Sequence, residues 1–212
     1  MSMIMQLKQL QHEELQRIEN NWDYFEGFIA EGAEGQAKSL RDLYSSQGIS
    51  SMPELFEKYP HMKQLDEEII FQMEKMLFGK NEREHGIGVI SLEKSWHGIH
   101  YLLSGEVWTG NSYLGKVLMG GNEIGDDSFD TGYGNPRYHP PESVKAISKG
   151  LPLLAEIRNK YDPTKMAEVG IYGFNGDEPG GEWEYLSHFY QEMFDYFHDA
   201  AKRGNGMILF VS

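Results

Sequence analysis

Two histidines, His97 and His100, stand three residues apart in the sequence WHGIH, a spacing that places their side chains about one helical turn apart. Both rings could then hold one metal ion, and with a carboxylate such as Asp126 they would suit a metal-dependent hydrolase. A catalytic zinc site needs a third protein ligand, however, and the neighbouring sequence offers neither a third histidine nor HExxH. His100 shares an apolar stripe with Trp96 and Leu103, which favours a buried, hydrogen-bonded core histidine. His97 is expected to be half exposed.

Residues 117–136 contain no Lys, Arg or His. This stretch holds the densest group of acids in the chain, which consists of Glu123, Asp126, Asp127 and Asp130. Such a loop could hold a divalent ion, but the spacing does not follow the EF-hand calcium pattern. Most runs of charge simply face water. Of the functional alternatives we favour a protein-binding epitope over an ion site.

A third group lies in the sequence GYGNPRYH, which brings together Tyr133, Arg137, Tyr138 and His139. A guanidinium group binds a carboxylate or a similar small anion through two parallel hydrogen bonds. Arg137 and Tyr133 could therefore form a small-anion sensor. Arg137 is also the only Lys or Arg between Lys116 and Lys145, so the structural alternative is an ion pair with one of the nearby acids.

The composition narrows the possible partners. The chain has 212 residues with 33 acidic and 19 basic side chains, a formal net charge of −14. This charge repels phosphate backbones and anionic lipid headgroups, so we expect neither nucleic acid nor a membrane as a partner. The longest stretches without a charged residue, 11 residues each, are too short to cross a bilayer. No motif indicates a cofactor, and we expect none.

The sequence also indicates a compartment. It contains no cysteine, which excludes disulfides, thiolate nucleophiles and iron–sulfur clusters and agrees with a reducing cytoplasm. The amino terminus shows no export signal, because Lys8 interrupts its apolar run. We therefore expect a cytoplasmic protein.

These observations favour a soluble, acidic, intracellular protein-binding module without catalytic activity, for example one that neutralises a basic partner such as a toxin. The hypothesis rests on the net charge, on the acidic loop 123–130 and on the lack of a complete catalytic set of residues. Complementary charge would speed the encounter with a basic protein. The metal-dependent hydrolase and the small-anion sensor stay open as alternatives.

The elements that position these residues are predicted from periodicity. Residues 3–10 indicate a short strand, and apolar residues at spacings of three and four predict a helix over 12–30. Further helices are expected over 36–46, from Pro53, and from Leu65 to Gly79. The amino-terminal part is therefore helical after its first strand.

The second half mixes strands and helices. Ser91 and Gly105 suit the caps of a helix over 92–104. Pro152 separates two helical segments, 141–149 and 151–160. Strands are predicted over 114–119, 136–139 and 169–174.

The carboxyl terminus contains the clearest pattern. Apolar residues repeat from Trp183 to Ala200 and predict a long helix that Gly204 ends. MILFV at 207–211 is apolar throughout, which predicts a buried strand in the interior of the sheet. The fold class is therefore α+β, with a small mixed or antiparallel sheet packed by several helices.

Several segments occur in an order and spacing that resemble a known family. They are SLEKSWHGIHYLLSG, YLGKVLMGGNEIG, TGYGNPRYHPPESVKAI, KYDPTKMAEVGIYGF and the closing helix, glycine and strand. Over residues 87–212 the chain resembles the YfbM-like family of bacterial domains of unknown function. The resemblance implies a compact α+β fold with a small sheet and brings no activity, cofactor or catalytic residue. We expect one domain over 1–212, with 31–85 as a variable helical part.

Overall fold

The computed structural model describes residues 3–18, 39–65, 67–78, 89–108, 112–125, 133–174 and 183–211. Over these residues the sheet is antiparallel and has five strands, in the order β2-β1-β5-β4-β3. The strands are β1 (Met5–Leu10), β2 (Ile90–Glu93), β3 (Asn122–Glu123), β4 (Arg137–His139) and β5 (Gly206–Val211). The predicted α+β class and the predicted strands at 3–10 and 136–139 are confirmed.

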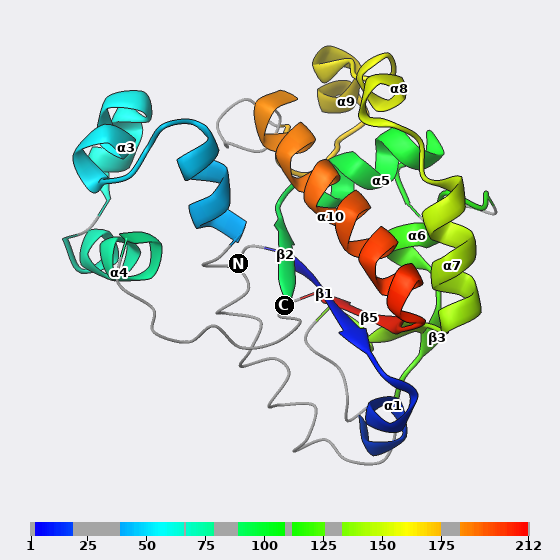
Figure 1. Cartoon of the computed structure of the whole chain (residues 1–212). Helices are drawn as coiled ribbons and strands as arrows, with labels where there is room; N and C mark the ends of the chain where they lie inside the picture. The colour runs from blue at the N-terminus through cyan, green and yellow to red at the C-terminus, as the bar shows by residue number, and fades with distance from the viewer. Residues whose placement is uncertain are drawn as a thin grey trace.

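Helices surround this sheet (Figure 1). They are α1 (His12–Ile18), a helix over 39–46, α3 (Met52–Lys58), the 3-10 helix η1 (Pro60–Gln64), α4 (Glu67–Phe78), α5 (Trp96–Ser104), α6 (Lys116–Met119), α7 (Pro141–Gly150), α8 (Leu154–Arg158), α9 (Pro163–Glu168) and α10 (Trp183–Arg203). None of these helices is both long and apolar enough to span a membrane.

The last strand, β5, lies in the middle of the sheet. It pairs with β1 from Met5↔Val211 to Leu10↔Gly206, and with β4 from Arg137↔Leu209 to His139↔Met207. Because side chains alternate across a strand, the apolar run of β5 supplies both faces of the sheet. The prediction of a buried interior strand at the carboxyl terminus is confirmed.

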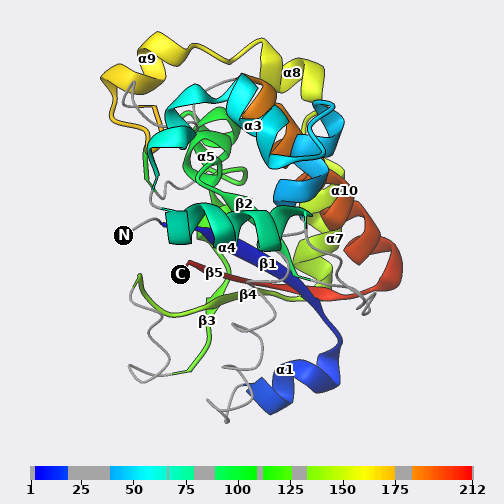
Figure 2. The same ribbon diagram turned by 90° about the vertical axis from the view of Figure 1, so that its left-hand side faces the viewer.

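The two faces of the sheet are covered differently (Figure 2). Helices α5, α7 and α10 lie on one face, and the large core beneath them includes Met207 and Leu209. Helix α1 lies on the other face, where a smaller core includes Ile208 and Phe210. The sheet is therefore buried between two apolar layers over its central strands.

The long helix α10 follows the predicted pattern. Its buried residues repeat at spacings of three and four and are Leu186, Phe189, Tyr190, Met193, Phe197 and Ala200. Gly204 adopts φ 72° directly after the helix, a conformation that glycine takes without steric cost. Lys202 and Arg203 lie in the last turn, where positive charge complements the helix dipole.

A separate small core lies to one side of the sheet. It joins the helix over 39–46 with α3 and α4 through Ile49, Met52, Leu55 and Leu77. The described elements between 39 and 78 are all helical, as expected for that segment. The expectation of a single domain over 1–212 stays a prediction.

Two predicted strands and the start of one predicted helix are wrong, while Gly105 ends that helix as expected. Residues 90–93 form β2, so Ser91 is not a helix cap; Glu93 has φ 48°, and the helix begins only at Trp96. Residues 116–119 form a helical turn instead of a strand, since the apolar run of three residues, 117–119, suits either structure. Residues 169–174 form turns, with Gly170 and Gly173 at positive φ. The buried Ile171 and Phe174 lie three positions apart, which is not the spacing of one face of a strand.

Candidate functional site

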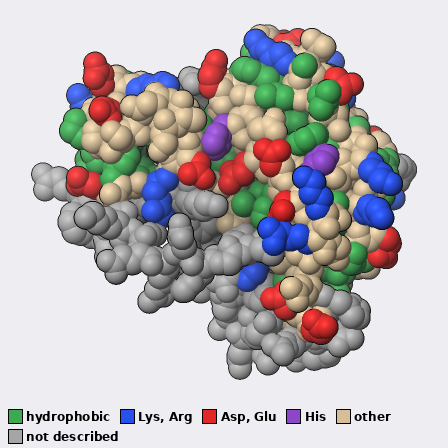
Figure 3. Space-filling view, in the orientation of Figure 1, with side chains coloured by type: hydrophobic (Ala, Val, Ile, Leu, Met, Phe, Trp, Pro, Cys, Tyr) green, Lys and Arg blue, Asp and Glu red, His purple; other side chains and the backbone are tan. Residues whose placement is uncertain are grey.

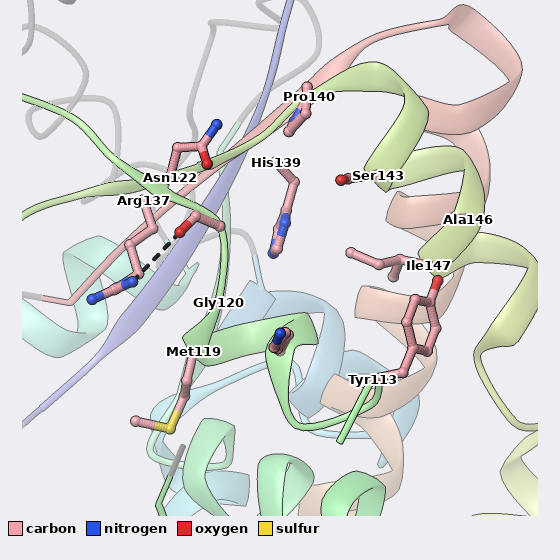
Figure 4. Close-up of a pocket in the computed structure, with 12 residues that line it drawn as sticks. Tyr113, Met119, Gly120, Asn122, Arg137, His139, Pro140, Ser143, Ala146 and Ile147 are labelled. Atoms are coloured by element: carbon pink, nitrogen blue, oxygen red, sulfur yellow. Dashed lines mark hydrogen bonds between the residues drawn. The ribbon is translucent and has the colours of Figure 1, made fainter. Parts of the chain in front are cut away.

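A cleft of about 590 Å³ lies between the turn that carries α6 and β3 on one side and β4 with α7 on the other (Figure 4). Its polar side chains come from four elements and from the turn before α6, and they are Tyr113, Lys116, Asn122, Arg137, His139 and Ser143. Cavities that bind small molecules have volumes of roughly 300–1,000 Å³, so the cleft has the size of a ligand site. We call it the cation cleft because both of its charged residues are basic.

Local structure explains how these elements meet. The chain reverses between α6 and β3 at Gly121, which has φ 96°. Its Cα lies so close to the Tyr138 carbonyl that a Cβ atom would be 2.8 Å from the carbonyl oxygen. Only glycine fits such a turn without strain. His139 then fixes α6 against β4, because its Nε2 lies 3.0 Å from the Val117 carbonyl oxygen. The α6 turn is therefore held at the edge of the sheet.

The two basic residues of the cleft, Arg137 and Lys116, differ in whether an acid neutralises them. Arg137 forms an ion pair with Glu123 at 2.5 Å, and its second terminal nitrogen donates to the Gly121 carbonyl (Figure 4, dashed line). This confirms the ion-pair alternative for Arg137 and shows that Glu123 is not unopposed. Lys116 is exposed and has no ion pair within the described residues. Every residue that lines the cation cleft is described, and none is acidic.

His139 lies at the wall of the cleft, and its Nε2–H already donates to the Val117 carbonyl oxygen. Burial lowers the pKa of its imidazole below 6.5, against the smaller opposite effect of its hydrogen bond to Val117. A neutral ring that donates from Nε2 carries no charge into the cleft near pH 7. Ser143 of α7 faces the same space (Figure 4), but no hydrogen bond joins Ser143 to His139 in this described region. The arrangement suits binding and does not form the linked nucleophile and base of a hydrolase.

His97 is a core residue, and the expectation of half exposure is wrong. Its exposed fraction is 1%. Nε2 lies 2.6 Å from the Val107 carbonyl oxygen, so it donates there, and Nδ1 accepts the Tyr172 amide N–H at 3.0 Å. The ring lies between two indoles, with ring centroids 5.0 Å from Trp96 and 4.7 Å from Trp108. Sequence reasoning missed this role because the ring's partners lie outside its helix.

His100 is buried and hydrogen-bonded, as the apolar stripe predicts. Its Nε2 lies 3.2 Å from the Trp108 carbonyl oxygen. His97 has no ring nitrogen left for a metal in this arrangement, and the described residues contain no group of three or more His, Asp or Glu that could hold one. Asp126, Asp127 and Asp130 lie outside the described residues. The metal site with Asp126 therefore stays untested.

The buried histidines predict how stability depends on pH. Burial lowers the pKa values of His97, His100 and His139 below 6.5, the ordinary value that they regain on unfolding. Below pH 6.5 the unfolded chain therefore binds protons that the folded chain does not. The free energy of unfolding is expected to be level above about pH 7 and to fall by up to ~1.4 kcal/mol per pH unit for each such histidine as the pH drops below 6.5.

Urea unfolding at pH 8, 7, 6 and 5.5 measures this dependence. Shifted carboxylates such as Glu54 and Asp199 have lowered pKa values and titrate below this range. Unfolding free energy that stays constant or rises from pH 7 to 5.5 would contradict the neutral, buried state of the three imidazoles.

Several residues of the cation cleft had no signal in the sequence. Tyr113, Lys116, Asn122 and Ser143 lie in segments that carry the family resemblance, but no motif gives them a chemical role. They meet only where the α6 turn and α7 approach β4. Tyr133, which was paired with Arg137 in the small-anion hypothesis, lies 38% exposed beside a neighbouring cavity that Arg137 also lines. Of the predicted residues, the structure thus brings together Glu123, Tyr133 and Arg137.

Fold and site together define an α+β protein with a small helix-covered antiparallel sheet and a cation-lined cleft near its β3 edge. The chain belongs to the family described as "Domain of unknown function (DUF1877)", which matches residues 1–210. Among solved structures it is similar to YfbM from Escherichia coli, a protein of unknown function, with 12% identity, a TM-score of 0.52 and 99% of each chain covered. The YfbM-like resemblance is confirmed, and it concerns the fold alone. No curated protein matches the chain.

Proposed function

We propose that this protein binds a small organic anion in the cation cleft. The observation that carries the proposal is the sign of the cleft's lining: two cations and several neutral donors, without one acid, in a chain of net charge −14. In such a chain a surface of random composition would contain acids more often than bases. A cleft that excludes them suits a negatively charged ligand.

The donors are of the kinds that hold anions. Lys116 provides a mobile ammonium group, and the Arg137 guanidinium is already oriented by Glu123 and by the Gly121 carbonyl. Ser143 lies in the first turn of α7, where the helix dipole adds positive potential. Hydrogen bonds to charged groups contribute about 1.5–3 kcal/mol each, so a few of them give measurable affinity.

The test compares thermal stability in acetate and phosphate with stability in chloride at equal ionic strength. A ligand that binds only the folded state raises the melting temperature as its concentration rises. Lys116→Gln removes the cleft's one charge that has no ion pair in the described part of the chain, and it is expected to weaken the affinity about tenfold. The matched control is Lys165→Gln, another exposed lysine, which lies in α9 away from the cleft. It is expected to leave the affinity unchanged.

Two outcomes would oppose the proposal. Either neither anion raises the melting temperature beyond the chloride reference, or Lys165→Gln reduces the effect as much as Lys116→Gln does. The second outcome would indicate general screening of surface charge instead of a site.

Recognition of a basic protein is a second candidate, and the net charge of −14 favours it. Figure 3 shows acidic and basic side chains intermixed on one face, so this face offers no single large acidic patch. The candidate epitope at 123–130 is described only as far as residue 125. A pull-down from the native host at low salt tests the idea, and recovery of no stoichiometric basic partner would count against it.

A further inference from the structure

An aromatic groove of about 400 Å³ adjoins the cation cleft. Most of its lining is apolar and comes from the strand ends of β1 and β5 and from α5 and α6; it includes Met5, Trp96, Trp108, Leu118, Leu209 and Val211. Trp108 is 56% exposed although it is one of the largest apolar side chains. An exposed indole at the rim of an apolar cavity is typical of a ligand site.

The two cavities share two residues. Met119 and Arg137 line both the cation cleft and the aromatic groove. Figure 4 shows both side chains on the same side of the cleft. Arg137 is fixed there by its ion pair with Glu123, while a methionine side chain adapts its shape easily. Met119 and Arg137 therefore form the boundary between the two cavities, and a molecule that lies across this boundary would contact both.

We infer that the anion is a hydrophobic monocarboxylate, whose carboxylate binds in the cation cleft and whose aliphatic or aromatic part lies in the aromatic groove. This inference rests on the proposed anion-binding function. The charges at the cleft indicate the charge of the ligand's head group. Glu123 neutralises Arg137, so within the described residues Lys116 alone contributes a positive charge that no acid neutralises. One extra positive charge suits a carboxylate better than a phosphate monoester, which carries about −1.5 to −2 at pH 7.

Calorimetric titration with acetate, butyrate and hexanoate at constant ionic strength tests the inference. Each methylene that leaves water contributes up to about fourfold in affinity. Hexanoate is therefore expected to bind at least tenfold more tightly than acetate. Hexyl phosphate, which has the same tail on a head of higher charge, is expected to bind more weakly than hexanoate.

Variants separate the two cavities. Trp108→Ala removes the rim of the groove and is expected to abolish most of the gain from acetate to hexanoate while acetate affinity changes less than twofold. Because the Trp108 ring also packs against the His97 ring, with centroids 4.7 Å apart, Tyr133→Ala provides a second test with an exposed side chain that lines the same groove. Val169→Ala is the control, since Val169 is also 38% exposed but lines neither cavity.

The outcomes distinguish this inference from the function on which it rests. Equal affinity for acetate and hexanoate, with both lost in Lys116→Gln, would overturn the hydrophobic tail and leave anion binding intact. Tighter binding of hexyl phosphate would overturn the assignment of a monocarboxylate. Absence of binding by all the probes would overturn both. A gain with chain length that survives both groove variants would also contradict the placement of the tail.

Discussion

A chain that lacks residues 207–212 is expected not to fold. This deletion removes most of the strand that joins β1 to β4, so the sheet would be divided in two. It also removes Met207, Ile208, Leu209 and Phe210, which are all nearly inaccessible to solvent. Each such side chain contributes about 1.5–3 kcal/mol when buried, against a net stability of ~5–15 kcal/mol for a domain.

Circular dichroism and thermal unfolding of the truncated chain measure the effect, with the full chain as reference. We expect no cooperative transition and poor solubility. A soluble truncated chain with an unchanged melting temperature would show that β5 is not the central strand.

Replacement of His97 is expected to have the largest effect of any point substitution discussed for this protein. His97→Ala leaves the Val107 carbonyl and the Tyr172 amide without their partner and opens a cavity between two indole rings. Unsatisfied buried polar groups cost ~1–3 kcal/mol each, and a cavity adds to that. We expect a loss of about 3 kcal/mol, where the sequence alone predicts a loss within roughly 0.5 kcal/mol for a surface histidine.

Two further variants separate the causes. His97→Phe keeps a flat ring between the indoles and removes only the hydrogen bonds, so it is expected to recover part of the lost stability. His61→Ala changes an exposed histidine and serves as control. A cost of His97→Ala equal to that of His61→Ala would contradict the buried bridge. If the cost disappeared in the presence of a chelator, a metal site at His97 would have to be reconsidered.

The sequence predicts best those helices and strands that bury a long, regular pattern of apolar residues. The long helix α10 and the strand β5 each have a continuous apolar stripe or run, so periodicity locates both. Short segments are different. Residues 116–119 are too few for helical and extended spacing to differ, and 169–174 buries Ile171 and Phe174 from turns while Val169 stays exposed.

The sequence predicts contacts between residues of the cleft only where the two residues are close in the sequence and have opposite charges. The ion pair of Arg137 with an acid follows from its isolation among acids, and Glu123 proves to be that acid. Lys116 and Ser143 had no such signal, because packing of α6 on β4 brings them together. His97 was misplaced for a related reason: helical periodicity locates a residue on its own helix, but Trp108 and Tyr172 cover that side.

The most direct test of anion binding is a nuclear magnetic resonance titration of the isotope-labelled chain with acetate, against chloride at equal ionic strength. We expect the His139 imidazole and the Lys116 side-chain signals to shift together and to saturate with one dissociation constant. The His97 imidazole, whose two nitrogens are bonded to the backbone away from the cleft, is expected to stay in place. Signals of His139 and Lys116 that move no more in acetate than in chloride would contradict the account.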